Sequence, residues 1–249
     1  MAREIAQTIV ALLGPRPRLW VAMLSLVFAA PALALAAVDS DASARILRTW
    51  TLDVRELATR QATQPTHRLR LEMAVQLGTR WEPGVILAAT RRAAAILAQC
   101  GVQTIAYLHE FAGPHRYRDL SSPVSRELAR KIGLRKPAIF FVDDTLHRPA
   151  FDAEAIGRSN SATRPEMTDT VWITSATRDL PIALAHELVH VLTDSGAHSN
   201  AVDNLMREDT AAGNTHLTAE QCASTRTMGA ANGLLERTGG NEPAVDALN

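Results

Sequence analysis

The sequence predicts one α+β domain in which a mixed, twisted sheet supports a helix that carries a cluster of polar residues. Three observations lead to this class. Short apolar segments typical of strands alternate with longer segments of helical periodicity. Apolar residues make up 47% of the 249 residues and charged residues 21%, which is typical of a globular protein with a substantial core. No internal repeat is present, and no linker is long enough to separate two domains.

Residues 1–36 differ in composition from the rest of the chain. Three arginines precede an apolar run over residues 19–38, which ends in small residues. This pattern predicts a secretory signal peptide cleaved after Ala36, and therefore a periplasmic or secreted protein with no membrane span after cleavage. An uncleaved membrane anchor is the alternative, because the run is just long enough to span a bilayer. Residues 37–237 would then form the domain and residues 238–249 a flexible tail.

The first predicted elements lie before residue 101. Residues 44–62 have the pattern of a first helix or helix-like arm. Residues 68–77 alternate polar and apolar positions, as a half-buried strand does. Residues 85–99 place apolar side chains at helical spacing, and Gly101 follows where a helix is expected to end.

The later elements complete the predicted sheet. Residues 102–111 read as a strand, and residues 112–136 as a loop with a short helix. The continuous apolar run in residues 137–144 predicts a central strand that is buried on both faces. Residues 169–175 predict a fourth strand, and residues 217–237 a last helix.

Charge and cysteine content bear on the possible partners of the protein and on whether it contains a disulfide. Lys plus Arg equals Asp plus Glu at 26 each, so the balance argues against nucleic acid as a partner. The chain contains two cysteines, Cys100 and Cys222. An even number in an exported chain permits a disulfide, and two buried free thiols are the alternative.

The segment "HELVH" contains the residues that point to chemistry. His186 and His190 are four positions apart, so both imidazoles lie on one side of a helix and can share one Zn²⁺ ion. Glu187 would lie beside the metal, where it can accept a proton from water. Asp179 is expected to cap the helix, with Pro181 in its first turn. The alternative is an amphipathic helix whose polar residues only face solvent.

A third ligand is needed for a catalytic zinc site with one open position. We expect the helix to end near Asp194, with Gly196 reversing the chain so that His198 becomes the third ligand. Two alternatives stay open. Asp194 would face the metal if the helix continued, or it could hydrogen-bond a ligand histidine. Glu208, further along the chain, is the other alternative.

These residues resemble the zincin metalloproteases, and among them the metzincins, which carry HExxHxxGxxH followed by a methionine in a tight turn. "HELVH" matches the first half of that motif. The second half departs from it, because Thr193 stands where glycine is expected and His198 follows His190 by two positions more than the motif has. "DNLM" is similar to the methionine turn, which makes Met206 the corresponding residue and a packing floor beneath the metal.

The resemblance implies a zincin-like fold and a zinc-dependent endopeptidase that acts on a peptide or protein substrate. Zinc would activate water and Glu187 would act as the general base. The resemblance also implies that the strand "TVWIT" before the motif is an exposed sheet edge that holds the substrate by strand addition. Trp172 on that strand would either line a subsite or pack in the core.

Two other classes of protein remain open from the sequence. The longer loop between His190 and His198 motivates a catalytically inactive module that binds zinc or peptide on the same scaffold. A membrane-tethered structural protein is a third hypothesis, if the leader is not cleaved. The remaining histidines are isolated in sequence and are expected to be surface or satisfied core residues: His67, His109, His115, His147 and His216.

Overall fold

The computed structural model describes residues 43–53 and 65–238 of the chain. The expected leader and its cleavage site lie outside the described residues, as does the tail beyond Thr238. Among the described residues, no helix is both long and apolar enough to cross a membrane.

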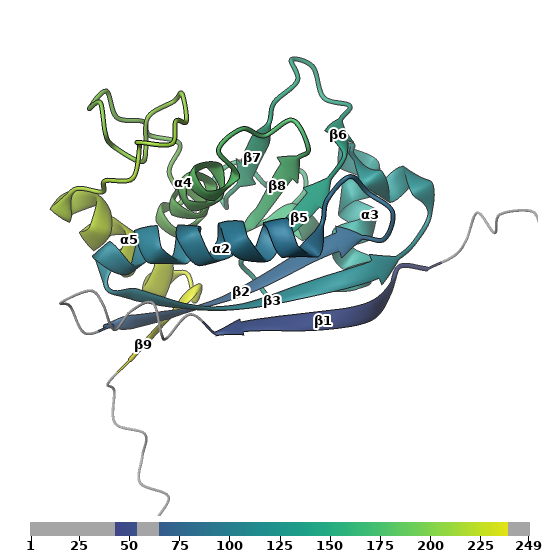
Figure 1. The fold of residues 1–249 in the computed structure, drawn as a ribbon, viewed down its shortest axis with the longest axis horizontal. Helices are drawn as coiled ribbons and strands as arrows, with labels where there is room; N and C mark the ends of the chain where they lie inside the picture. Colours follow the sequence, from purple (N-terminus) through teal and green to yellow (C-terminus); the bar gives the residue numbers. More distant parts are fainter. Residues whose placement is uncertain (1–42, 54–64, 239–249) are drawn as a thin grey trace, which may run out of the picture. The chain divides into compact units, whose positions relative to one another are not determined.

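The strands form a mixed sheet of seven strands (Figure 1). Four of them, β2, β3, β5 and β8, run parallel to one another, and β1, β7 and β9 are antiparallel to their neighbours. The order is β1 (Arg45–Asp53), β3 (Val102–Ala112), β2 (His67–Gln76), β5 (Ala138–Val142), β8 (Thr170–Thr174) and β7 (Ala153–Ile156), and β9 (Leu235–Arg237) pairs with the start of β2. Two short strands, β4 (Asp119–Leu120) and β6 (Asp144–Thr145), form a separate pair.

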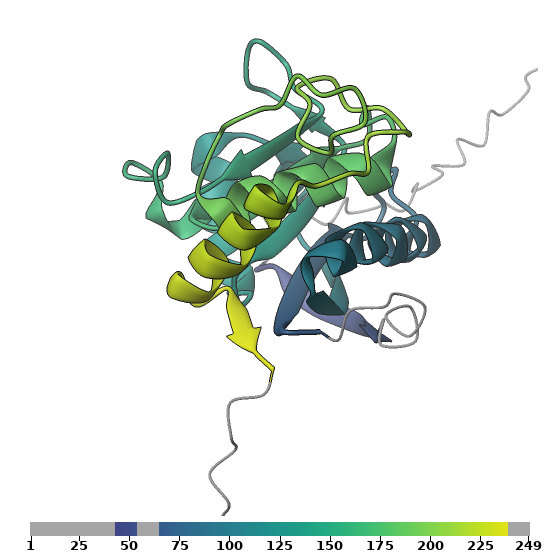
Figure 2. The same ribbon diagram turned by 90° about the vertical axis from the view of Figure 1, so that its left-hand side faces the viewer.

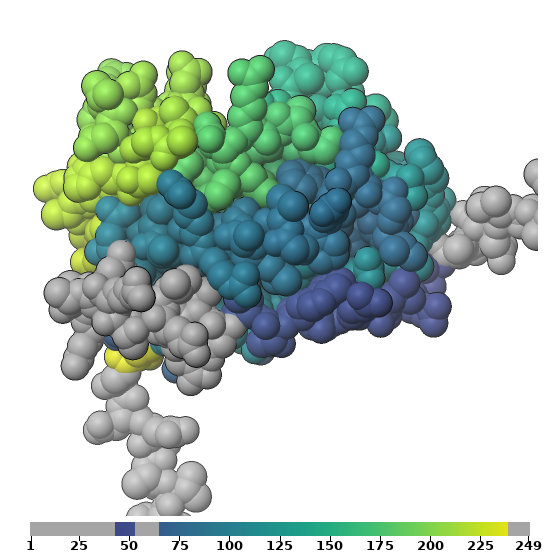
Figure 3. All heavy atoms as spheres, viewed as in Figure 1, coloured from purple at the N-terminus to yellow at the C-terminus, as the bar shows by residue number. Residues whose placement is uncertain are grey.

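Helices cover both faces of the sheet. The helices are α2 (Pro83–Leu97), α3 (Ser122–Ile132), α4 (Leu180–Thr193) and α5 (Ala219–Ala231), with short 3₁₀ turns η1 (Ala98–Cys100), η2 (His115–Arg118) and η3 (Pro165–Met167). One core contains side chains of α2, α4 and α5, and a second core on the other face contains those of α3. Figure 2 shows α5 beside α4, and Figure 3 shows the outer side of α2 at the surface.

The alternation of side chains along β5 and β8 explains their continuous apolar sequence. Ile139 and Phe141 belong to the core beneath α2 and α4, whereas Phe140 belongs to the core beneath α3. Every residue of β5 is buried, as the sequence predicts for a central strand. The expected helix end at Gly101 is also confirmed, because this glycine has a left-handed φ of 71°.

Strand β1 corrects the helix expected over residues 44–62. Residues 45–53 are extended and pair antiparallel with β3, and residues 54–62 lie outside the described part. The outer edge of β3, a strand of 11 residues, offers backbone partners that a local helix would leave unpaired. Contacts distant in sequence therefore decide the conformation of this segment.

Two further differences concern the sheet. The strand "TVWIT" is β8, and it lies between β5 and β7, so the edge of the sheet is β7. Trp172 is fully buried and stacks on Phe140 with ring centroids 4.3 Å apart, so it belongs to the core and not to a subsite. In the C-terminal segment, the expected helix stops at Ala231, and Gly233 turns the chain into β9.

Candidate metal centre

Helix α4 carries the candidate metal ligands, and almost its whole surface is buried. It begins after Asp179, which has a left-handed φ of 46° and whose side chain makes no capping hydrogen bond, contrary to expectation. The backbone carbonyl of Asp179 instead accepts from the amides of Ile182 and Ala183. Pro181 lies in the first turn as expected, where its missing amide proton costs no helical bond.

Three histidines converge beside this helix. His186 and His190 are buried on α4, and the exposed His198 approaches from the following loop. The Nε2 atom of His190 lies 2.9 Å from that of His186 and 3.2 Å from that of His198. One nitrogen from each ring lies within 4.8 Å of the others, so the three residues could hold a metal ion.

The backbone determines which ring nitrogens face each other. Nδ1 of His186 lies 2.8 Å from the carbonyl oxygen of Leu205, and Nδ1 of His190 lies 2.6 Å from that of Ser195. A carbonyl oxygen only accepts hydrogen bonds, so each Nδ1 carries the proton. In the neutral imidazoles, the lone pairs of the two Nε2 atoms therefore point at each other and repel, unless a cation lies between them.

The surroundings disfavour protonation of these rings. Burial lowers the pKa of His186, and it lowers the pKa of His190 to about 4, with further lowering from the neighbouring histidines. A metal ion therefore fits the cluster better than an added proton. Tetrahedral zinc with bonds of about 2.1 Å would separate the nitrogens by roughly 3.4 Å, close to the 2.9 and 3.2 Å that separate His190 from the other two. Three protein donors leave one position open.

The chain turns toward His198 at a different residue from the one expected. Helix α4 ends at Thr193, and Asp194 adopts the left-handed conformation with φ of 48°, whereas Gly196 does not. Aspartate tolerates this conformation better than most residues. Its carboxylate Oδ1 accepts from the amide of Ser159 at 3.0 Å, and a Cβ atom on Gly157 would come within 2.7 Å of that oxygen. Asp194 is thus hydrogen-bonded to the loop after β7 and is not part of the histidine group.

The turn that contains Met206 lies next to the histidines. Met206 is buried, its amide donates to the side chain of Asn204 at 2.9 Å, and its carbonyl accepts from Ser199 at 2.7 Å. The side chain of Asn204 is also paired with that of Gln221 by two hydrogen bonds of 2.9 and 3.1 Å. Through Leu205 between Asn204 and Met206, this turn orients the imidazole of His186.

Sequence reasoning missed the roles of Asn204 and Gln221. Thr218 and Gln221 form a capping box at the start of α5, and this signal was readable in the sequence. Nothing in the sequence indicated that the same glutamine also holds the turn. Helix α5 is itself joined to η1 by a disulfide between Cys100 and Cys222, the pair considered above.

Glu187 faces a cleft beside the histidines. The cleft has a volume of about 490 Å³, and β7 forms one wall of it. Burial raises the pKa of the Glu187 carboxyl to about 7; a hydrogen bond from the backbone of Ala155 opposes this, and the charge of Glu154 adds to it. Glu208 also lines the cleft but lies outside the histidine group.

The exposed edge of β7 borders this cleft. The amide of Thr174 donates to Asp152 of the neighbouring segment, so Asp152 is a hydrogen-bonded position of the antiparallel pair. Hydrogen-bonded positions alternate along such a pair, so the backbone groups of Ala153 and Ala155 point away from β8. The carbonyl of Ala155 accepts from Asn160 at 3.3 Å. The sheet edge next to the candidate metal centre is therefore β7.

Comparisons with known proteins give a fold-level likeness. No family model matches the chain, and no curated protein matches its sequence. A solved structure of metalloproteinase-II from Bacteroides fragilis is similar to this chain with a TM-score of 0.47 and 17% sequence identity. The likeness covers 71% of this chain and 61% of that one.

Proposed function

We propose that the chain is an exported zinc-dependent endopeptidase, in which His186, His190 and His198 hold the metal and Glu187 is the general base. The observation that carries this proposal is the convergence of the Nε2 atoms of three histidines. Two of these histidines, His186 and His190, have their Nδ1 protons committed to backbone carbonyls. Bound zinc would supply a Lewis acid that polarises a peptide carbonyl and lowers the pKa of water.

The protein residues supply the proton transfers and the orientation of the substrate. Glu187 has a pKa near 7, so at neutral pH its carboxylate can accept a proton from water and later return it to the leaving amine. The outward backbone groups of Ala153 on β7 can hold an extended peptide by strand addition. This arrangement supports a peptide or protein as the substrate.

Export is supported by the disulfide between Cys100 and Cys222, because such bonds persist in oxidising compartments. The leader sequence supports the same proposal. Edman sequencing of the mature protein tests it directly. An N-terminus at Ala37 is expected, and a retained leader would favour the membrane anchor instead.

Metal analysis together with peptide cleavage tests the catalytic proposal. The purified chain should bind about one zinc ion and cleave a mixed peptide library. Glu187→Gln should keep zinc and lose cleavage by at least about 100-fold. Glu82→Gln is a matched control, because Glu82 is exposed at the start of α2 and makes no capping bond. Zinc binding without any cleavage by the unmutated chain would support the inactive binding module.

The ligand set is tested by three alanine variants. His198→Ala should weaken zinc binding, whereas Asp194→Ala and Glu208→Ala should retain the full zinc content. Loss of zinc from the Glu208 variant alone would show that the third ligand was assigned wrongly.

A further inference from the structure

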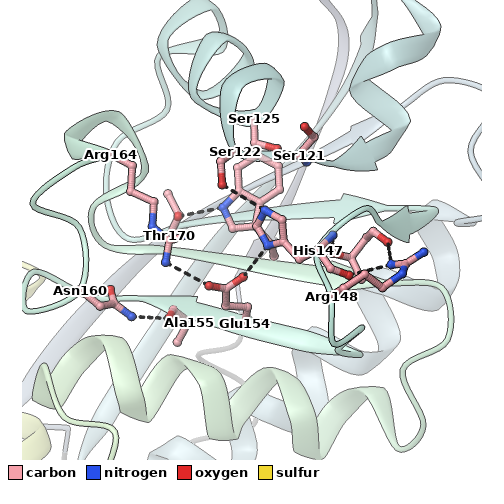
Figure 4. A network of polar contacts seen from close by, with 12 residues as sticks. Ser121, Ser122, Ser125, His147, Arg148, Glu154, Ala155, Asn160, Arg164 and Thr170 are labelled. Carbon is pink, nitrogen blue, oxygen red and sulfur yellow. Dashed lines mark hydrogen bonds and ion pairs between the residues drawn. The ribbon is translucent and has the colours of Figure 1, made fainter.

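A second group of polar side chains, those of Ser122, His147 and Glu154, lies on the other face of β7 (Figure 4). The hydroxyl of Ser122 lies 3.0 Å from Nε2 of His147, and Nδ1 of the same ring lies 3.6 Å from Oε2 of Glu154. Ala153 and Ala155 of β7 pack against the core that contains α4, so the alternation of side chains places Glu154 on the side of α3. Strand β7 thus lies between His147 and the histidine cluster, and Glu154 also borders the cleft beside the histidines.

In this geometry Ser122 can donate a hydrogen bond to His147, and His147 in turn faces the carboxylate of Glu154. A hydroxyl can donate to Nε2 only if Nδ1 carries the ring proton, and that proton then points toward Glu154. At 3.6 Å this contact is too long for a hydrogen bond, and it becomes an ion pair when the ring takes up the proton of Ser122. Oε2 of Glu154 is buried and has no hydrogen-bond partner in the part of the chain that the structure describes. Its other oxygen accepts from Arg164 at 3.1 Å.

The surroundings hold the imidazole in place. The backbone amide of His147 donates to the hydroxyl of Thr145 at 3.1 Å, and its ring lies against Phe151 with centroids 5.7 Å apart. Ser122 is the first residue of α3, and the first intrahelical bond runs from Ser125 to Ser121. The amides of Ser122 and Val124 therefore have no partner within the helix and can donate to an anionic oxygen.

A cavity lies beside Ser122. Its volume is about 350 Å³, at the lower end of the range of roughly 300–1,000 Å³ found for small-molecule sites. Polar side chains form most of its wall: Ser122, Arg126, Asn160, Thr163 and Arg164, together with Pro123. A small, polar substrate fits a cavity of this size and lining better than a long acyl chain.

We propose that Ser122 is the nucleophile of a second, metal-independent site that hydrolyses short-chain carboxylic esters, with His147 as the base and Glu154 as the residue that positions the imidazole. A serine is activated when a base lies within hydrogen-bond reach of its hydroxyl and a third group holds that base in position. This activity is separate from peptide cleavage at the metal centre.

The proposed reaction has two steps. Ser122 Oγ bonds to the ester carbonyl carbon while its proton passes to Nε2 of His147, and the bond from that carbon to the alkoxy oxygen then breaks as the alcohol leaves with this proton. Water then attacks the acyl group and gives a proton to Nε2. The carboxylic acid leaves as the bond to Oγ breaks and Oγ recovers the proton.

Labelling with a fluorophosphonate probe, followed by intact-mass analysis and peptide mapping, tests the nucleophile. One adduct on Ser122 is expected in the full chain, and it should persist in excess EDTA and in Glu187→Gln. Ser122→Ala should lose the adduct and the hydrolysis of p-nitrophenyl acetate. Ser121→Ala is the matched control, because Ser121 keeps its backbone bonds to Ser125 and should be labelled normally. Mapping the adduct on the unmutated chain requires no variant to fold.

The base and the positioning residue are tested by kinetics. His147→Gln should slow labelling on the order of 100-fold. Glu154→Gln should lower the maximal rate of labelling without changing the probe concentration that gives half of that rate, a split that a general loosening of the cavity would not produce. No adduct on the unmutated chain, an adduct on another residue, or an adduct lost with EDTA would overturn the proposal.

Discussion

Replacing Asn204 by alanine should weaken the candidate metal centre without changing any of its three histidines. Asn204 is completely buried, and its side chain accepts from the Met206 amide and exchanges two hydrogen bonds with Gln221. Alanine removes all three bonds. The turn between Asn204 and Met206 would lose the contacts that direct the Leu205 carbonyl at His186.

The expected magnitude follows from those three bonds. The Met206 amide is left buried without its partner, which costs about 1–3 kcal/mol, and each lost bond to the half-buried Gln221 costs about 1 kcal/mol. The free energy of unfolding of the metal-free protein should therefore fall by roughly 3–5 kcal/mol. Because Leu205 orients a ligand ring, zinc affinity should fall by about 10- to 100-fold.

Urea unfolding of the metal-free protein measures the first effect, and competition with a chromophoric chelator measures the second. Asn214→Ala is the matched control. Asn214 is also buried, but its side chain donates to the Asp209 carbonyl and has no link to His186. It should lose stability while keeping its zinc affinity. An Asn204→Ala protein that binds zinc as tightly as the unmutated chain would refute the reasoning.

Three further predictions concern titration and covalent structure. Because burial raises the pKa of Glu187 to about 7 and only its carboxylate accepts a proton, kcat/KM for peptide cleavage should decline as the pH falls through 7; a flat profile down to about pH 5 would contradict this. Replacing Cys100 and Cys222 by serine removes a disulfide that joins residues 122 positions apart. The free energy of unfolding, measured by chemical denaturation, should therefore fall by up to about 5 kcal/mol. Burial lowers the pKa of Lys136 from 10.5 to about 8, so the folded chain binds fewer protons than the unfolded chain between these values. The free energy of unfolding should therefore rise by up to roughly 3 kcal/mol from pH 8 toward 10.5, a slope that Lys136→Met should lack in the same titration.

Patterns that depend on neighbouring residues were readable from the sequence. The helical spacing in α2 comes from one-sided burial, and the structure confirms this helix. The strand expected over residues 68–77 is present as β2, but it is not half-buried, because every residue from Leu71 to Gln76 is buried. The spacing of His186 and His190 places both rings on one side of α4, where the structure has them. The mixed α+β class follows from these same patterns.

Features that depend on distant partners were not readable. Strand β1 exists because β3 has a free edge, and β7 is only 4 residues long, too short to show a period. The carbonyls of Ser195 and Leu205 orient the rings of His190 and His186, and no sequence pattern indicates where a backbone carbonyl will point. His147 is isolated in the sequence, yet folding places it between Ser122 and Glu154.

The residues of the histidine cluster lie close together in the sequence, and this affects when during folding an ion can bind. The three rings, and the two carbonyls that orient two of them, all come from residues 186–205. In contrast, β2 pairs with β9 near the far end of the chain, and the disulfide spans 122 positions. Closing a short loop costs less entropy than closing a long one. Binding of an ion by these residues therefore need not wait until β9 pairs with β2.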